Sequence, residues 1–205
     1  MRTQNLLLIF ALFFLTATST LHGTAGDYDG GGGSTDFIRR SCNTTLYPDV
    51  CFTSLSRYAN AVQQNPGQLA RVAISVTLSK VHRVVSFVSN LTRVADYSGD
   101  SRAASAIHDC FTNLDDAVDE IRGSLKQMRR IGASGSGEGS FLFQMSNVQT
   151  WMSSALTDQE TCTDGFEDVE DGTVKTQVCD RVSNVKKFTS NALALVNSYA
   201  NKGAP

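Results

Sequence analysis

Residues 154–166 have the sequence SALTDQETCTDGF, in which apolar residues recur at the spacing of one helix face. A second stretch, residues 107–125, has the same spacing, and each stretch contains one cysteine. If Cys110 and Cys162 pair, two antiparallel helices are joined, and the acidic residues beside the cysteines form one shared outer surface. The two stretches therefore predict a disulfide-stabilised helical protein that presents an acidic surface to a partner.

The N-terminus has the pattern of a secretory signal peptide. Arg2 precedes an apolar run over residues 6–15, and small residues follow up to Ala25. The run is about half as long as the roughly 20 residues that span a bilayer, so residues 1–25 are interpreted as a cleaved signal peptide and not as an anchor. No later segment is expected to be apolar enough to span a membrane. The mature chain, residues 26–205, is expected to be secreted.

The charge of the mature chain is nearly balanced. The 18 Lys and Arg residues include Arg2, so the chain without residues 1–25 has 17 basic and 20 acidic residues and a formal charge of −3. This balance argues against nucleic acid or an anionic membrane as the main ligand, because both are bound by strongly basic surfaces. Acidic residues gather at 109–120 and 158–171.

The five cysteines predict disulfides with one thiol left over. Cys42 and Cys51 flank a Tyr-Pro-Asp turn, so a local disulfide between them is the simplest pairing, although the spacing alone does not fix the connectivity. If Cys110 pairs with Cys162, Cys179 remains. It is interpreted as a partly buried free thiol, with an intermolecular disulfide in a dimer as the alternative.

Two N-x-[ST] sequons mark candidate glycosylation sites. Asn43 begins one and Asn90 begins the other. In a secreted chain each asparagine accepts a glycan only if it is exposed. Exposure is therefore the property to be checked.

Three segments follow the predicted signal peptide. Residues 26–34 are rich in glycine and are expected to form a flexible tail. Residues 35–66 are expected to form an N-terminal helical hairpin, and residues 67–205 a bundle of four long helices. The predicted fold class is therefore all-α, an up-down-up-down four-helix bundle with an N-terminal hairpin, in one domain over residues 35–205.

Apolar residues in the bundle segment repeat near the 3.5-residue period of packed helices. Helices are predicted at about 68–95, 101–131, 141–169 and 173–200. A mobile loop rich in glycine and serine is predicted over 132–140. Trp151 flanks the apolar stripe of the third helix and is expected in the core. The positions expected to face the core are Ile74, Leu78, Val81, Val85, Val88, Ile107, Cys110, Leu114, Val118, Ile121, Leu125, Met128, Met145, Val148, Met152, Ala155, Cys162, Phe166, Val169, Val174, Val178, Val182, Val185, Phe188, Ala192, Leu195 and Tyr199.

The chain has no combination of residues typical of an enzyme. The mature chain contains two histidines, His82 and His108, on different predicted helices, and Cys110 is expected on a packed seam. C-x-x-C and H-E-x-x-H motifs are absent, so neither a metal nor a cofactor is predicted. The carboxylates at 115–120 are expected on an outer helix face, without the burial that would separate their pKa values.

Antiparallel helices joined at Cys110 and Cys162 bring particular polar residues together. Asp116 and Asp119 are expected near residues 155–159, because moving forward along one helix means moving backward along the other. Thr161 lies beside the disulfide and Asp164 just beyond it. The expected result is a binding face, and not a pocket, that complements a basic or polar protein surface.

A set of motifs across nearly all of the mature chain resembles the plant invertase and pectin methylesterase inhibitor family. The motifs are Ser41-Cys42 and Cys51 with Leu46-Tyr47-Pro48 between them, Asp109-Cys110, Asp116-Ala117-Val118-Asp119, Trp151 with Ser154-Ala155-Leu156-Thr157, Thr161-Cys162, and Ser190-Asn191-Ala192-Leu193-Ala194-Leu195. The resemblance implies a four-helix bundle with an N-terminal hairpin. It also implies the disulfides Cys42–Cys51 and Cys110–Cys162 and a free fifth cysteine.

The resemblance is stronger to the pectin methylesterase inhibitors of this family. Thr161 matches the threonine that those inhibitors place against the esterase, and Asp116, Asp119 and Asp164 match their contacting acids. The implied function is a secreted, monomeric inhibitor in the cell wall that covers the pectin cleft of one esterase molecule. An acid invertase is the alternative target, and a secreted helical receptor ligand is the alternative of another class. The loop at 132–140 looks longer than is usual in the family.

Overall fold

The computed structural model describes residues 30–95, 100–131 and 138–203, and all regular secondary structure in these ranges is helical. The N-terminal hairpin contains α2 (Gly30–Cys42), α3 (Pro48–Leu55), the 3-10 helix η1 (Ser56–Tyr58) and α4 (Ala59–Val62). The bundle contains α5 (Pro66–Ala95), α6 (Ser101–Ile131), α7 (Glu138–Asp164) and α8 (Thr173–Ala200). The predicted fold class is confirmed.

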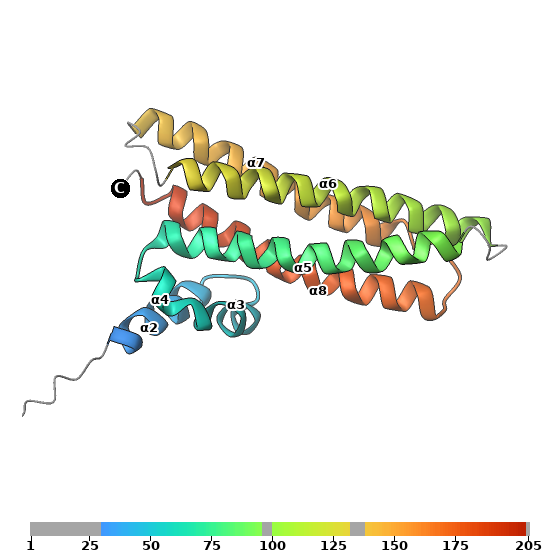
Figure 1. Cartoon of the computed structure of the whole chain (residues 1–205), viewed down its shortest axis with the longest axis horizontal. Coiled ribbons are helices and arrows are strands. Elements are labelled where there is room, and N and C mark those ends of the chain that lie inside the picture. The colour runs from blue at the N-terminus through green and yellow to red at the C-terminus, as the bar shows by residue number, and fades with distance from the viewer. Residues whose placement is uncertain (1–29, 96–99, 132–137, 204–205) are drawn as a thin grey trace, which may run out of the picture.

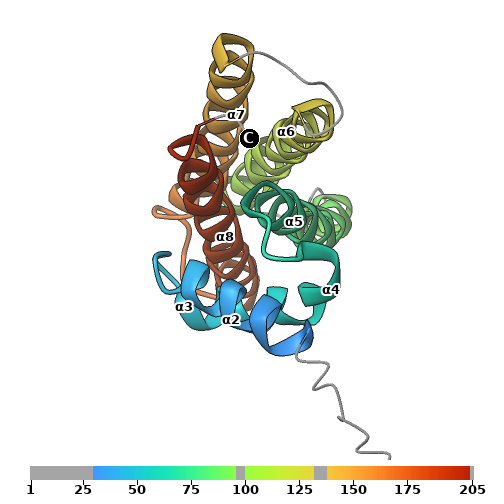
Figure 2. The same cartoon turned by 90° about the vertical axis from the view of Figure 1, so that its left-hand side faces the viewer.

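The four long helices form a closed ring when the bundle is viewed along its length. α5 packs against α6, α6 against α7, α7 against α8, and α8 against α5 (Figure 1) (Figure 2). α5 and α7 therefore lie at diagonally opposite corners. The N-terminal hairpin packs against α5 and α8, on the side of the bundle away from α6 and α7 (Figure 1).

Side-chain caps define where two of the long helices begin. The side-chain oxygen of Asn65 accepts a hydrogen bond from the backbone N–H of Gln68 at 2.9 Å, and Pro66 occupies the first helical position of α5. At the start of α6, Asp100 Oδ1 accepts two backbone N–H groups of the first turn, both at 3.0 Å. These groups have no partner within the helix, so the caps stabilise both starts.

The core of the bundle follows the predicted apolar seams. Every predicted core position in the second and third helices is at most 7% exposed. In α5, Ile74, Val81 and Val88 are fully buried, whereas Leu78 and Val85 are half-buried. Among the predicted seam positions, Val174 is wrong: it is 41% exposed, because it lies in the first turn of α8 at the edge of an open cavity.

The third helix ends at Asp164, five residues before its predicted end at residue 169. The chain continues in turns, with backbone hydrogen bonds from Glu167 to Asp164 at 2.9 Å and from Val169 to Phe166 at 3.1 Å. Phe166 and Val169 nevertheless remain buried. The apolar spacing therefore continues past the helix, which is why the sequence pattern placed its end too late.

The start of α2 differs from the prediction, because residues 30–34 are helical and do not belong to a flexible tail. Ser34 is 7% exposed, and a Cβ atom added at Gly33 would lie 3.2 Å from the side-chain nitrogen of Gln64. This end of α2 thus packs against the chain that follows α4, a contact that glycine-rich composition does not reveal. The predicted signal peptide and residues 132–137 lie outside the described residues, and residues 138–140 belong to α7.

α5 has the length and composition of a helix that could cross a membrane, over Pro66–Arg93. The expectation that no segment after residue 25 has this property was therefore wrong. The apolar residues of α5 are used differently in the structure, because Ile74, Val81 and Val88 pack inside the bundle. α5 is a core helix here.

Aromatic packing connects the C-terminal end of α8 to the starts of α5 and α7. Gly67 lies under the ring of Tyr199, and a Cβ atom at this position would come within 2.8 Å of Tyr199 Cζ. The Tyr199 ring also meets the Phe141 ring edge to face, with centroids 5.3 Å apart. The absence of a side chain at Gly67 therefore permits the contact between α5 and α8.

Asn191 of α8 holds the hairpin to the bundle. Its Oδ1 accepts the backbone N–H of Tyr47 at 3.0 Å, and its Nδ2 donates to the Tyr47 carbonyl oxygen at 2.8 Å. Asn191 is 4% exposed, so water does not readily replace these bonds. One side chain thus satisfies both backbone groups of a residue in the turn between α2 and α3.

We expect Asn191→Ala to lower the free energy of unfolding by about 2 kcal/mol, because it leaves the backbone N–H of Tyr47 without a partner and removes one of the two hydrogen bonds to its carbonyl oxygen, which Cys51 N–H also donates to. Urea denaturation of the purified protein measures this loss. Asn184→Ala, at an exposed position of the same helix, is the matched control and should change stability by about 0.5 kcal/mol or less. Equal stabilities of the two variants would contradict this role of Asn191.

Candidate functional site

The disulfide between Cys110 and Cys162 joins α6 to α7, with the two Cα atoms 4.1 Å apart. This distance sets the register of the two antiparallel helices. As a result, Asp116 of α6 lies close enough to Asp158 of α7 for their charges to interact. The predicted approach of Asp116 to residues 155–159 is confirmed.

The four predicted partner-binding residues are all exposed, and they lie on α6 and α7. Asp119 forms an ion pair with Arg122 one turn along α6. Thr161 donates its hydroxyl hydrogen bond to the carbonyl oxygen of Thr157 at 3.0 Å. The term acidic surface is used below for the outer face of α6 and α7 that contains Asp116, Asp119, Glu120, Trp151, Ser154, Asp158, Thr161 and Asp164.

Two carboxyl groups meet across the helix pair at the centre of the acidic surface. The pKa of Glu120 is raised from 4.5 to about 7, mainly by burial and in addition by the nearby Asp158 carboxyl and the negative charge of Asp116, against a lowering by the Ser154 hydroxyl. Burial also raises the pKa of Asp158, and the hydrogen bond with Glu120 lowers it. The expectation that the acids at 115–120 lack burial is therefore wrong for Glu120.

The side chain of Glu120 is half-buried, and its Oε2 atom is buried without a hydrogen-bond partner in the described part of the chain. Such an atom is costly as part of a carboxylate, because a buried charge loses its hydration. A proton on the pair formed by Glu120 and Asp158 reduces that cost. The pair therefore favours one shared proton near neutral pH.

Trp151 lies on the acidic surface and not in the core, which corrects the prediction. It is 36% exposed, and its ring covers Gly123 of α6, where an added Cβ atom would lie 3.5 Å from the ring. The absence of a side chain on Gly123 leaves room for the Trp151 ring against α6. The helical spacing placed Trp151 beside the apolar stripe, but it gave no indication of the glycine opposite.

The structure contains a second disulfide and one free cysteine, and it exposes both sequon asparagines. Cys42 and Cys51 form the second disulfide, with Cα atoms 5.5 Å apart, and Cys179 is the free cysteine of the described residues. Burial raises the pKa of the half-buried Cys179 thiol, which disfavours the thiolate that forms disulfides. Asn43 and Asn90 are both exposed, as a glycan acceptor requires.

No group of three metal-ligating side chains converges within residues 30–95, 100–131 and 138–203. His82 is exposed on α5, and His108 is exposed on α6. The acidic surface is thus composed of carboxylates, hydroxyls and one aromatic ring on a rigid helix pair. Such a surface is suited to contact another protein by shape and charge.

Comparison with known proteins gives the family. The family model described as Plant invertase/pectin methylesterase inhibitor matches residues 36–195. The chain belongs to this family. Pectinesterase inhibitor 11 of Arabidopsis thaliana is 43% identical over 168 residues, which cover 82% of this chain and 82% of that protein. The 21 kDa protein of Daucus carota is 41% identical over 167 residues, which cover 81% of this chain and 84% of that protein.

A solved member of the family has the same architecture. A mutant form of a pectin methylesterase inhibitor from Arabidopsis matches with a TM-score of 0.59, over 76% of this chain and 92% of that chain, at 18% identity. At this identity the match supports the fold alone. The family identified from the motifs is confirmed, and its members are described as inhibitors, in agreement with the expectation that the chain is not an enzyme.

We expect the pair of Glu120 and Asp158 to make the folded protein less stable as the pH rises. Below pH 4.5 Glu120 is protonated in both the folded and the unfolded chain. Between 4.5 and about 7 only the folded chain keeps the proton, so stability falls with increasing pH. Thermal melting from pH 5 to pH 8 should therefore show a smaller decrease in Tm for Glu120→Gln than for the wild type.

Glu167→Gln, at an exposed position after α7, is the control for this measurement and should follow the wild-type pH profile. The comparison isolates Glu120, because each variant loses one carboxyl group and keeps the other titrating groups of the wild type. If the Tm of Glu120→Gln falls with pH as steeply as that of the wild type, Glu120 does not titrate in this range.

Proposed function

We propose that this protein is an extracellular inhibitor of pectin methylesterase that binds the enzyme through its acidic surface. The observation that carries the proposal is the membership of a family of such inhibitors, together with an exposed acidic surface on the helix pair joined by Cys110–Cys162. In this proposal one inhibitor covers the pectin-binding cleft of one esterase and excludes the polysaccharide. The protein acts by occupying the cleft, and it has no catalytic role of its own.

The acidic surface has the features of a preorganised docking surface. Asp116, Thr161 and Asp164 are exposed, so their polar groups are available to a partner. Trp151 supplies a large apolar area next to these polar groups, a combination common at the centre of protein interfaces. Because the disulfide holds α6 and α7 in register, little ordering of the backbone is needed on binding.

The location of the protein follows from the same proposal. The pattern of residues 1–25 directs the chain to the secretory pathway, where disulfides form and persist. Pectin and its methylesterase meet in the plant cell wall. The mature inhibitor is therefore placed in the apoplast, as a monomer, with Asn43 and Asn90 as candidate glycan sites.

An acid invertase is the second candidate target, because the family description names both enzymes. The relatives favour the esterase, since Pectinesterase inhibitor 11 shares 43% identity with this chain. A receptor ligand with the same fold is the alternative of another class. These three functions predict different results in one titration.

The function is tested by titrating the purified mature chain against a plant pectin methylesterase and a plant acid invertase. We expect loss of esterase activity at a one-to-one ratio and no loss of invertase activity. Inhibition of the invertase alone would replace the proposed target. No effect on either enzyme would leave the receptor ligand as the remaining candidate.

We expect Asp116→Lys combined with Asp119→Lys to abolish inhibition of the esterase, because two lysines reverse the charge at the middle of the acidic surface. Both positions are exposed, so circular dichroism and Tm should stay close to those of the wild type. Initial rates of de-esterification measure the inhibition.

The matched control reverses the charge at Asp36 and Asp49, which are exposed on α2 and α3 of the N-terminal hairpin. Asp36→Lys combined with Asp49→Lys makes the same change in net charge away from α6 and α7. This control should inhibit the esterase as the wild type does. Full inhibition by the Asp116 and Asp119 variant would remove the acidic surface from the interface.

A further inference from the structure

Two helices at opposite corners of the bundle, α5 and α7, have charged residues of opposite sign. α5 contains the basic residues Arg71, Lys80, Arg83 and Arg93 and no acidic residue. α7 contains four acidic residues and no basic one. Because α5 and α7 are diagonally opposite, the basic residues of α5 lie on the side of the bundle away from α7. The weak net charge of the chain hides this separation.

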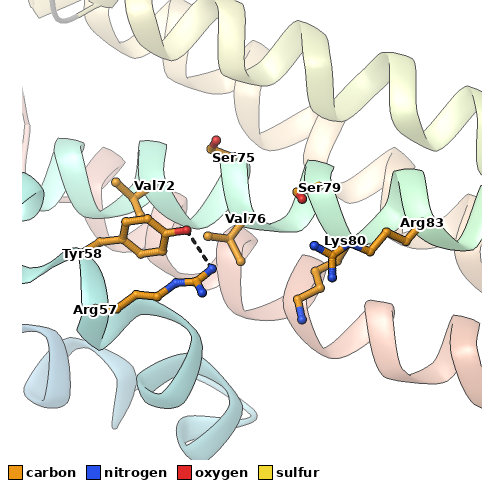
Figure 3. Close-up of a pocket in the computed structure, with 8 residues that line it drawn as sticks. All are labelled: Arg57, Tyr58, Val72, Ser75, Val76, Ser79, Lys80 and Arg83. Atoms are coloured by element: carbon orange, nitrogen blue, oxygen red, sulfur yellow. Dashed lines mark hydrogen bonds between the residues drawn. The ribbon is translucent and has the colours of Figure 1, made fainter.

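A groove lies on this basic side, between the N-terminal hairpin and α5. A cavity of about 280 Å³ is lined by Arg57 and Tyr58 from η1 and by Lys80 and Arg83 from α5 (Figure 3). A second cavity of about 400 Å³ shares Arg57 and Lys80 and extends to Phe188 of α8. The two adjoining cavities are called the basic groove below.

The three basic side chains of the groove are not neutralised by carboxylates. Arg57 donates a hydrogen bond to the Tyr58 hydroxyl at 2.9 Å (Figure 3). Its guanidinium group also lies over the Tyr58 ring. The Lys80 ammonium lies 4.9 Å from the centre of the Phe188 ring. The ion pairs among the described residues use Arg122, Lys175 and Lys186, and none uses a base of the groove.

Aromatic rings attract these cations without occupying most of their N–H donors. The lysine ammonium therefore keeps hydrogen-bond donors for an external acceptor. In Figure 3 the side chain of Arg83 extends along α5 toward Lys80, so positive charge is concentrated at one end of the first cavity. Asp49 is the one acid that lines either of the two cavities. The groove thus has an excess of positive charge with free donors.

The other groups along the groove are those that contact sugars. The hydroxyls of Ser75, Ser79 and Tyr58 alternate with the apolar side chains of Val72 and Val76 along the first cavity. Hydroxyls exchange hydrogen bonds with a carbohydrate, and the apolar residues pack on the C–H face of a sugar ring. The α5 residues that line the first cavity run from position 72 to position 83, a length of about 16 Å at 1.5 Å per residue. This length suits a chain of units better than one small anion.

We propose that the basic groove binds a carboxylate-bearing stretch of polysaccharide, namely pectin from which the methyl groups have been removed. The identity of the polysaccharide rests on the proposed function, because a pectin methylesterase converts neutral methyl esters into carboxylates and methanol. The product of the target enzyme therefore has the charge that Arg57, Lys80 and Arg83 attract. The esterified polymer lacks that charge.

The positions of the two surfaces allow both ligands to be bound at once. The basic groove lies on α5 and the hairpin, whereas the acidic surface lies on α6 and α7 (Figure 1). A polysaccharide in the groove therefore leaves the esterase-binding face open. In this arrangement the inhibitor is retained where the enzyme has already acted.

A nucleic acid fits the groove less well, although it is also a polyanion. Its binding proteins usually have a strongly basic net charge, whereas this chain has a formal charge of −2. The aromatic rings of the groove are covered by Arg57 and Lys80, so bases cannot stack on those faces. Single-stranded DNA of similar length is therefore a useful competitor in the test.

The test measures binding of oligogalacturonates to the purified mature chain by isothermal titration calorimetry, without esterase and without divalent cations. The de-esterified oligomer should bind, and the fully methyl-esterified oligomer of the same length should not. Binding should weaken at high salt, because the groove is open to solvent. Lys80→Gln combined with Arg83→Gln should weaken it at least about tenfold, because two charged donors are lost.

Lys126→Gln combined with Arg129→Gln, at exposed positions of α6, removes the same charge elsewhere and should bind the oligomer as the wild type does. Circular dichroism verifies the helicity of both double variants. The proposal is overturned by equal binding of the two oligomers, by no binding, or by equal loss in both variants. Tighter binding of single-stranded DNA would also overturn it, in favour of a nucleic acid.

The esterase assay separates this proposal from the proposed function. Lys80→Gln combined with Arg83→Gln should still inhibit the esterase, because the changed residues lie away from the acidic surface. A chain that binds the oligomer but does not inhibit would refute the proposed function and keep the groove. A chain that inhibits but does not bind the oligomer would refute the groove alone.

Discussion

The disulfide between Cys110 and Cys162 is the constraint on which the acidic surface depends. It closes a segment with a sequence separation of 52, for which the chain-entropy model gives a stabilisation of about 4 kcal/mol. It also fixes how far α7 can slide along α6. A shift of one helical turn, about 5.4 Å, would separate Glu120 from Asp158 and Trp151 from Gly123. The disulfide therefore keeps both of these contacts in register.

Much of the fold could be predicted from the sequence, because the core-facing residues of each bundle helix recur at a regular spacing. The second and fourth long helices begin and end at the predicted residues, and the capping residue Asp100 explains the first of these starts. The prediction fails where the apolar spacing continues beyond a helix, or where a helix forms without that spacing. Phe166 and Val169 keep the spacing in turns, and Gly33 enters a helix because of a distant contact with Gln64.

The candidate sites were less predictable, because they depend on contacts between separate elements. The exposed acids of the acidic surface could be placed from helix geometry and the disulfide. The raised pKa of Glu120 could not, since it requires the burial that Asp158 and its helix provide. Likewise, Arg57 and Phe188 are far apart in the sequence, and only the docked hairpin places them around the same groove. Opposite charges on opposite corners thus emerge from the assembly of the helices.

The packing of Tyr199 on Gly67 couples the two ends of the folded domain. Tyr199 belongs to the last turns of α8, and Gly67 lies directly after the hairpin. A carboxypeptidase that trimmed the chain past Tyr199 would uncover the start of α5 and the edge of Phe141. Loss of the last turn of α8 would therefore loosen the bundle at the end where α5 and α7 begin.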